Sequence, residues 1–138
     1  MTRLGSLFVV ALLPACAGEP LDASGTWNLQ LFTGAGSCNN PGELLDVSVI
    51  ADFNGETYVF TVPGAGPDDL VSGSFECGEE CDFDLRIESY QRTLPMGTST
   101  FLVDLHIDEA LAISGTGELT IRGDRNCSLR LTATGMVQ

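Results

Sequence analysis

From Thr26 onward the chain alternates apolar and polar residues in short runs. Trp27, Leu29 and Leu31 share one parity, while Asn28 and Gln30 share the other. A period of two is typical of a strand with one buried face, whereas a helix repeats every 3.6 residues. The runs that alternate in this way are residues 26–31, 45–53, 58–62, 70–76, 82–88, 101–107, 111–121 and 128–133. The sequence therefore predicts an all-β domain of eight strands.

Eight antiparallel strands fit either a closed barrel or a two-sheet sandwich, because both bury every second residue. The connections favour the barrel. Those at 34–43, 63–68 and 92–98 are long and rich in glycine and proline, whereas Asn54-Gly55 and Asp108-Glu109 look tight. Asn54-Gly55 is typical of a two-residue type I′ turn. We expect an eight-stranded antiparallel up-and-down barrel with a loop-rimmed mouth and a closed base, and a β-sandwich as the alternative.

The chain has five cysteines, an odd number for an exported protein. If Cys16 is modified in another way and takes no part in a disulfide, the remaining four cysteines allow three pairings. The first and last strands of a closed meander are neighbours, which brings Cys38 to the same end as Cys127. Cys77 and Cys81 flank a turn at the other end. We predict disulfides Cys38–Cys127 and Cys77–Cys81, formed in an oxidising compartment.

The first residues have the pattern of an export signal. A basic start at Arg3 precedes an apolar segment, residues 4–13, that is too short to span a bilayer. The stretch Leu13-Pro14-Ala15-Cys16 resembles the bacterial lipobox, in which the cysteine is lipidated and becomes the first residue after cleavage. The alternatives are secretion by cleavage before Gly18 and a retained membrane anchor.

This resemblance implies the domain plan and the location. Residues 1–15 are expected to be a lipoprotein signal peptide, residues 16–24 a tether lipidated at Cys16, and residues 25–138 the barrel domain. The protein is then anchored by its lipid in the bacterial cell envelope, in the outer membrane on its periplasmic or surface face. The formal net charge of −13 argues against nucleic acid and anionic lipid surfaces as electrostatic partners.

Few residues suggest catalysis or metal binding. His106 is the single histidine and falls on the polar face of its strand, with no acid or nucleophile that the sequence places beside it. The acidic turn at 76–84 has two interpretations: its carboxylates bind a calcium ion, or it is a solvated hairpin closed by a disulfide. We predict a protein that is not an enzyme, with no cofactor and no metal site, and leave calcium at the turn open.

Gly25-Thr26-Trp27 at the start of the first strand resembles the G-x-W signature of the lipocalins and their calycin relatives. The resemblance implies that Trp27 plugs the barrel base and that an apolar ligand enters from the opposite, loop-rimmed end. Inward positions then give a candidate ligand-binding set: Leu31, Val47, Phe60, Leu85, Phe101 and Val103.

Two functions follow from this pattern. The first is a lipid-anchored module that binds a small apolar ligand inside the barrel. The second is a non-enzymatic structural or interaction module whose interior is fully packed and whose loops meet an envelope protein or a polysaccharide. A cavity would favour the first function, and a filled interior with an exposed apolar patch would favour the second.

Overall fold

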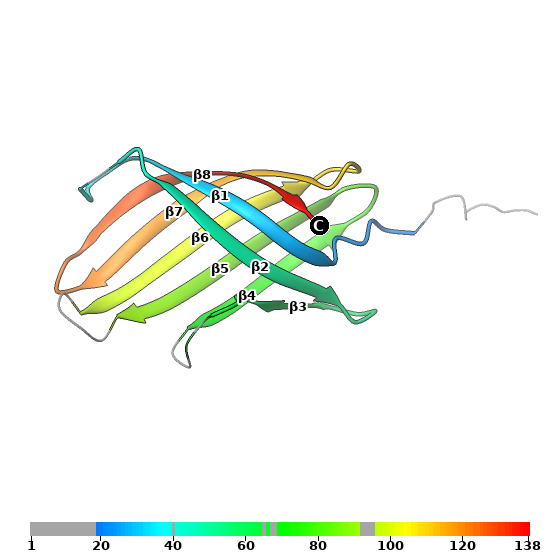
Figure 1. The fold of residues 1–138 in the computed structure, drawn as a ribbon, viewed down its shortest axis with the longest axis horizontal. Coiled ribbons are helices and arrows are strands. Elements are labelled where there is room, and N and C mark those ends of the chain that lie inside the picture. Colours follow the sequence, from blue (N-terminus) through cyan, green and yellow to red (C-terminus); the bar gives the residue numbers. More distant parts are fainter. Residues whose placement is uncertain (1–18, 40, 65, 67–68, 92–95) are drawn as a thin grey trace, which may run out of the picture.

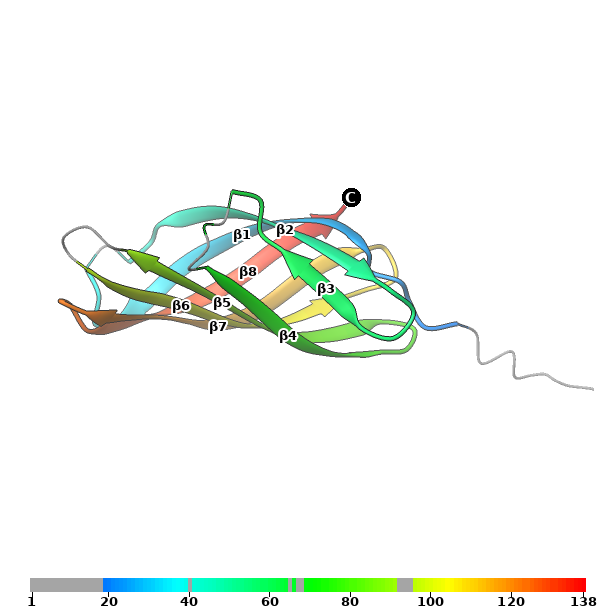
Figure 2. The ribbon, with the colours of Figure 1, turned by 90° about the horizontal axis from the view of Figure 1, so that it is seen from below.

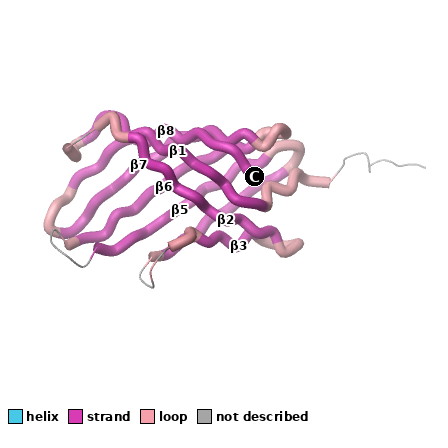
Figure 3. Tube along the Cα trace, viewed as in Figure 1, coloured by secondary structure: helices cyan, strands magenta, loops and turns pink. Residues whose placement is uncertain are grey.

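The chain forms one antiparallel sheet of eight strands that curls into a barrel (Figure 1). The computed structural model describes residues 19–39, 41–64, 66, 69–91 and 96–138. The strands are β1 (Gly25–Gly36), β2 (Leu44–Phe53), β3 (Tyr58–Thr61), β4 (Leu70–Cys77), β5 (Cys81–Gln91), β6 (Gly97–Ile107), β7 (Ala112–Gly123) and β8 (Cys127–Val137). Among these residues there is no helix, and the turns and loops gather at the two ends of the sheet (Figure 3).

The first and last strands of the chain pair in the middle of the sheet. β1 lies between β2 and β8, so that Trp27 is opposite both Val49 and Val137. The strand order is β3-β2-β1-β8-β7-β6-β5-β4, which leaves β3 and β4 as the two edges that face each other (Figure 2). Because all eight strands share one nearly closed sheet, the predicted up-and-down barrel is confirmed and the sandwich alternative is wrong.

The interior is filled by alternate residues of the strands. Trp27, Leu29 and Leu31 of β1 are each at most 2% exposed, whereas the side chains between them are exposed. The other strands contribute inward side chains in the same way, including Leu105 of β6 and Leu131 of β8, each 2% exposed. The alternation in the sequence thus corresponds to the inner and outer faces of the barrel wall.

Aromatic side chains hold the β3–β4 seam, by which we mean the facing edges of these two strands. No backbone hydrogen bond joins the two strands in the part of the chain that the structure describes. Tyr58 of β3 instead meets Phe75 of β4 edge to face, with ring centroids 4.8 Å apart. Phe60 lies against Gly73, where a Cβ atom would be 3.2 Å from the ring. Such aromatic pairs contribute about 0.5–1.5 kcal/mol each beyond the area they bury.

Residues 19–24 lie against the base end, which we define as the end with the turns that follow β2, β4 and β6 (Figure 1). Ala23 is 0% exposed; its N–H donates to Tyr58 Oη at 2.9 Å, and its carbonyl accepts from Trp27 Nε1 at 2.7 Å. The N–H of Leu21 donates to a carbonyl of the turn after β4 at 2.7 Å. The described part of the expected tether is therefore packed on the barrel.

Both predicted disulfides are confirmed. Cys38–Cys127 joins the loop after β1 to the start of β8. It lies at the end of the barrel opposite the base end, where β1 and β7 end and β8 begins; we call this the mouth end. Cys77–Cys81 closes the turn between β4 and β5 at the base end. The two bridges therefore brace opposite ends of the barrel.

The turn between β2 and β3 is longer than predicted. Instead of a two-residue turn at 54–55, four residues connect the strands, and Phe53 pairs with Tyr58. The Asn54 side chain accepts hydrogen bonds from two backbone N–H groups within the turn, at 2.9 and 3.0 Å, which stabilises the longer connection. A two-residue turn would place Glu56 opposite Phe53 on the inward face, where its carboxylate would lose solvation. The prediction of a type I′ turn is therefore wrong at this position.

Candidate functional site

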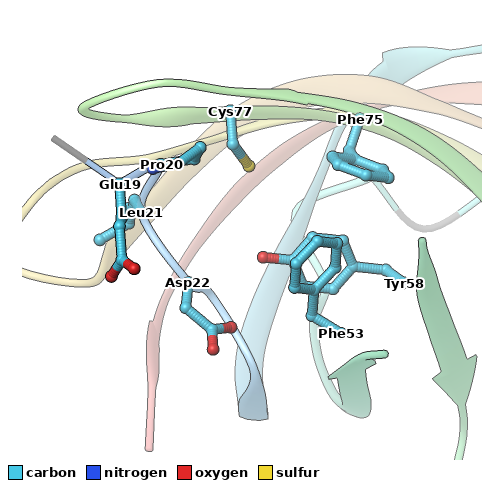
Figure 4. Close-up of a pocket in the computed structure, with 8 residues that line it drawn as sticks. All are labelled: Glu19, Pro20, Leu21, Asp22, Phe53, Tyr58, Phe75 and Cys77. Carbon is cyan, nitrogen blue, oxygen red and sulfur yellow. The ribbon is translucent and has the colours of Figure 1, made fainter. Parts of the chain in front are cut away.

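An apolar hollow lined by described residues opens at the base end, beside the β3–β4 seam (Figure 4). It has a volume of about 340 Å³. Its lining comes from the N-terminal segment and from the base ends of β2, β3 and β4, and consists of Glu19, Pro20, Leu21, Asp22, Phe53, Tyr58, Phe75 and Cys77. We call this hollow the base-end pocket.

Three aromatic rings form one wall of the base-end pocket. Phe53 and Tyr58 are paired residues of β2 and β3, and their ring centroids lie 4.8 Å apart. Phe75 comes from β4 across the seam, with its centroid 6.0 Å from that of Phe53. The rings bridge the seam, and the pocket lies between them and the N-terminal segment.

Tyr58 orients its hydroxyl toward the N-terminal segment, where it accepts the Ala23 N–H. Burial raises the pKa of the Tyr58 phenol; the Ala23 N–H opposes this rise, and the nearby Asp22 carboxylate adds to it. The phenol is therefore neutral at physiological pH. It contributes a polar atom to a wall that is otherwise apolar.

Carboxylates lie on the other side of the base-end pocket. Asp22 Oδ1 accepts the backbone N–H of Ser24 at 2.9 Å, and hydrogen bonds from the Ser24 side chain and backbone lower the pKa of Asp22. Glu19 lies beside it in the segment and also lines the pocket (Figure 4). None of the arginines that the structure describes is among the lining residues. The pocket thus combines an aromatic wall with a negative edge.

The six residues predicted to bind a ligand all belong to or pack against the barrel core. Leu31, Leu85 and Val103 are each at most 2% exposed. The other three are partly buried and pack against that core: Val47, Phe60 and Phe101. None of the six lines the base-end pocket. The connections expected to rim the mouth contain positions 40, 65, 67–68 and 92–95, which lie outside the described residues.

Trp27 lies near the start of β1, toward the base end. It is 0% exposed, and its ring meets Phe83 edge to face with centroids 4.7 Å apart and Phe60 at 5.6 Å. The indole N–H is satisfied by the carbonyl of Ala23. Trp27 therefore lies between the N-terminal segment, residues 19–24, and the barrel core.

The pocket residues were missed for two reasons. Residues 19–22 were assigned to the tether, since they carry no strand periodicity. Phe53, Tyr58 and Phe75 fall in predicted strands, but the resemblance implies that the ligand enters at the mouth end. The available signal was the concentration of aromatic residues at 53, 58, 60, 75 and 83.

His106 lies on the outer face and is held between two carboxylates. Its Nδ1 is 2.8 Å from Asp82 Oδ1, and its Nε2 is 2.8 Å from Glu80 Oε1. Hydrogen bonds with Asp82 and then Glu80 raise the pKa of the imidazole. Both ring nitrogens are engaged, so neither is free to act as a general base in this arrangement. Among the residues that are described, no group of three or more His, Cys, Asp and Glu side chains could hold a metal ion.

Comparisons with protein-family models, curated proteins and solved structures gave no match. Within the described ranges, no helix is long and apolar enough to cross a membrane.

Proposed function

We propose that this protein is a lipid-anchored, non-enzymatic binding module of the bacterial cell envelope, and that its barrel takes a small apolar ligand in the base-end pocket. Alternate side chains of the strands fill the barrel interior, so the proposal places the ligand in the base-end pocket, which is the observation that carries it. Small-molecule sites are concave, mostly apolar hollows of roughly 300–1,000 Å³ with a few placed polar groups. A volume of about 340 Å³, three aromatic rings and the Tyr58 hydroxyl fit this description.

The proposed anchor would bring this pocket close to a membrane. Cys16 precedes Glu19, the first lining residue, by three residues. Three extended residues span at most about 10 Å. On this proposal the base-end pocket is the part of the barrel nearest the bilayer, which suits a ligand that partitions between membrane and protein.

A pair of pocket-filling variants tests the proposal. The probe is N-phenyl-1-naphthylamine, a neutral apolar dye whose emission increases in apolar surroundings. Leu21→Trp enlarges a side chain that lines the base-end pocket, and Phe101→Trp makes a matched change toward the mouth end. We expect Leu21→Trp to weaken dye binding about tenfold, equivalent to losing roughly 55 Å² of buried apolar contact at about 25 cal/mol/Å². Phe101→Trp should leave the affinity unchanged.

Thermal unfolding of both variants serves as the control for folding. Loss of binding in Phe101→Trp alone would place the ligand toward the mouth end and refute the base-end pocket. Absence of dye binding in the unmodified protein would refute a ligand-binding function.

The second candidate function is a packed interaction module, and exposed apolar residues at the seam favour it. Val59 of β3 is 53% exposed and Leu70 of β4 is 62% exposed. A partner protein could cover them. This candidate predicts no dye binding and instead requires a partner that protects Val59 and Leu70 from solvent.

A further inference from the structure

The base-end pocket combines two chemistries that together select a ligand class. Its wall carries the rings of Phe53, Tyr58 and Phe75, and its edge carries the carboxylates of Glu19 and Asp22 (Figure 4). The faces of aromatic rings attract cations electrostatically, and more strongly where water is excluded. Carboxylates attract the same charge. Both features therefore favour a positively charged group.

Nothing described at this pocket would balance an anion. The chain contains no lysine, and no described arginine lines the pocket. Arg86 is engaged with Glu88 on the outer face of β5, and Arg130 is exposed on the outer face of β8. The formal net charge of −13 adds a field that repels anionic ligands and attracts cationic ones. A fatty-acid carboxylate would meet like charges at the pocket edge.

We propose that the ligand of the base-end pocket is a small organic cation with an apolar body, such as an alkyl or aryl ammonium compound. The apolar body packs between Leu21 and the aromatic wall, and the ammonium group lies between the rings and the carboxylates of Glu19 and Asp22. This inference rests on the proposed function, because it assigns a charge class to the ligand of the same pocket.

Three probes with the same benzyl body separate charge from apolar contact: benzyltrimethylammonium, benzyl alcohol and phenylacetate. Each competes with N-phenyl-1-naphthylamine for the full chain purified in mild non-ionic detergent. We expect benzyltrimethylammonium to displace the dye at a concentration at least about tenfold lower than phenylacetate, with benzyl alcohol between them.

A charge-neutralising variant tests the role of the pocket edge. Glu19→Gln with Asp22→Asn removes both carboxylates, and asparagine retains an oxygen for the Ser24 N–H. The affinity for benzyltrimethylammonium should fall roughly tenfold while that for benzyl alcohol is unchanged. Asp46→Asn with Glu118→Gln makes the same change in net charge on the outer face and should have little effect.

The outcomes separate this inference from the proposed function. If the dye binds but benzyltrimethylammonium competes no better than benzyl alcohol, the cation preference is wrong and the apolar pocket stands. An equal loss of cation affinity in both double variants would attribute the preference to net charge and also overturn the inference. If the dye does not bind, both proposals fail.

Discussion

Removal of the Cys38–Cys127 disulfide should destabilise the barrel far more than removal of Cys77–Cys81. The first bridge links residues separated by 89 positions and the second links residues separated by 4. In the chain-entropy model a disulfide stabilises the fold by lowering the conformational entropy of the unfolded chain. This stabilisation is about 4.6 kcal/mol for the longer loop and about 1.9 kcal/mol for the shorter one. The expected difference, about 2.7 kcal/mol, depends only on the two separations.

The assay is urea unfolding of two double variants, Cys38→Ala with Cys127→Ala and Cys77→Ala with Cys81→Ala. Cys81 is 0% exposed, so its replacement also removes a buried sulfur and adds about 1 kcal/mol to the cost of the second variant. The variant that lacks Cys38–Cys127 should still be less stable by about 1.5–2 kcal/mol. Equal stabilities, or a less stable Cys77–Cys81 variant, would refute the chain-entropy reasoning for this barrel.

Three further predictions concern individual side chains. The raised pKa of His106 means that its contribution to stability is fully present below about pH 6.5 and is lost as the pH rises through the folded-state value. The difference in melting temperature between wild type and His106→Ala should therefore shrink from about pH 5 to about pH 9; a growing difference would contradict it. Asp104 shares a hydrogen bond with Asp84 across β5 and β6, which raises the pKa of Asp104. Asp104→Asn should stabilise the protein by about 0.5 kcal/mol at neutral pH, as measured by urea unfolding, and not near pH 3; destabilisation at neutral pH would be the opposite result. Tyr58→Phe leaves the buried Ala23 N–H without its acceptor and should cost about 1–3 kcal/mol. Hydrogen exchange at Ala23 should accelerate, and unchanged protection would rule out a role for this bond.

The fold could be predicted because alternation identifies each strand from its own residues, and the lengths of the connections indicate how the strands are ordered. Alternating residues such as Trp27, Leu29 and Leu31 define one buried face without knowledge of any partner strand. The long and short connections then favour a meander, in which the first and last strands meet. That meeting brings Cys38 to Cys127 and made the pairing predictable before any register was known.

The base-end pocket could not be predicted because it depends on contacts between distant residues. Ala23 is fixed by the hydroxyl of Tyr58, 35 residues later, and by the indole of Trp27. Residues 19–24 show no strand periodicity, and hydrogen bonds to distant residues of the barrel fix their position. β3 and β4 are the two edges of the sheet, and among the described residues no backbone ladder joins them, so strand patterning alone does not define the space beside this seam.

The pairing of His106 depended on register in the same way. Alternation placed His106 on the outer face, and Asp82 was also expected there. Only the β5–β6 register puts the two directly opposite each other, so that the imidazole meets the carboxylate at 2.8 Å. A shift of two residues would preserve the buried face and remove this contact.

The central claim is that the barrel holds a small apolar ligand at its base end. The most direct test is the intact mass of the full chain purified from its native envelope in mild detergent, compared under native and denaturing conditions. We predict a small-molecule adduct that is present natively, is lost on denaturation, and is less abundant in the Leu21→Trp variant. A native mass that equals the denatured mass, with only acyl chains on Cys16 and the two disulfides accounted for, would contradict a ligand-binding function and favour the packed interaction module.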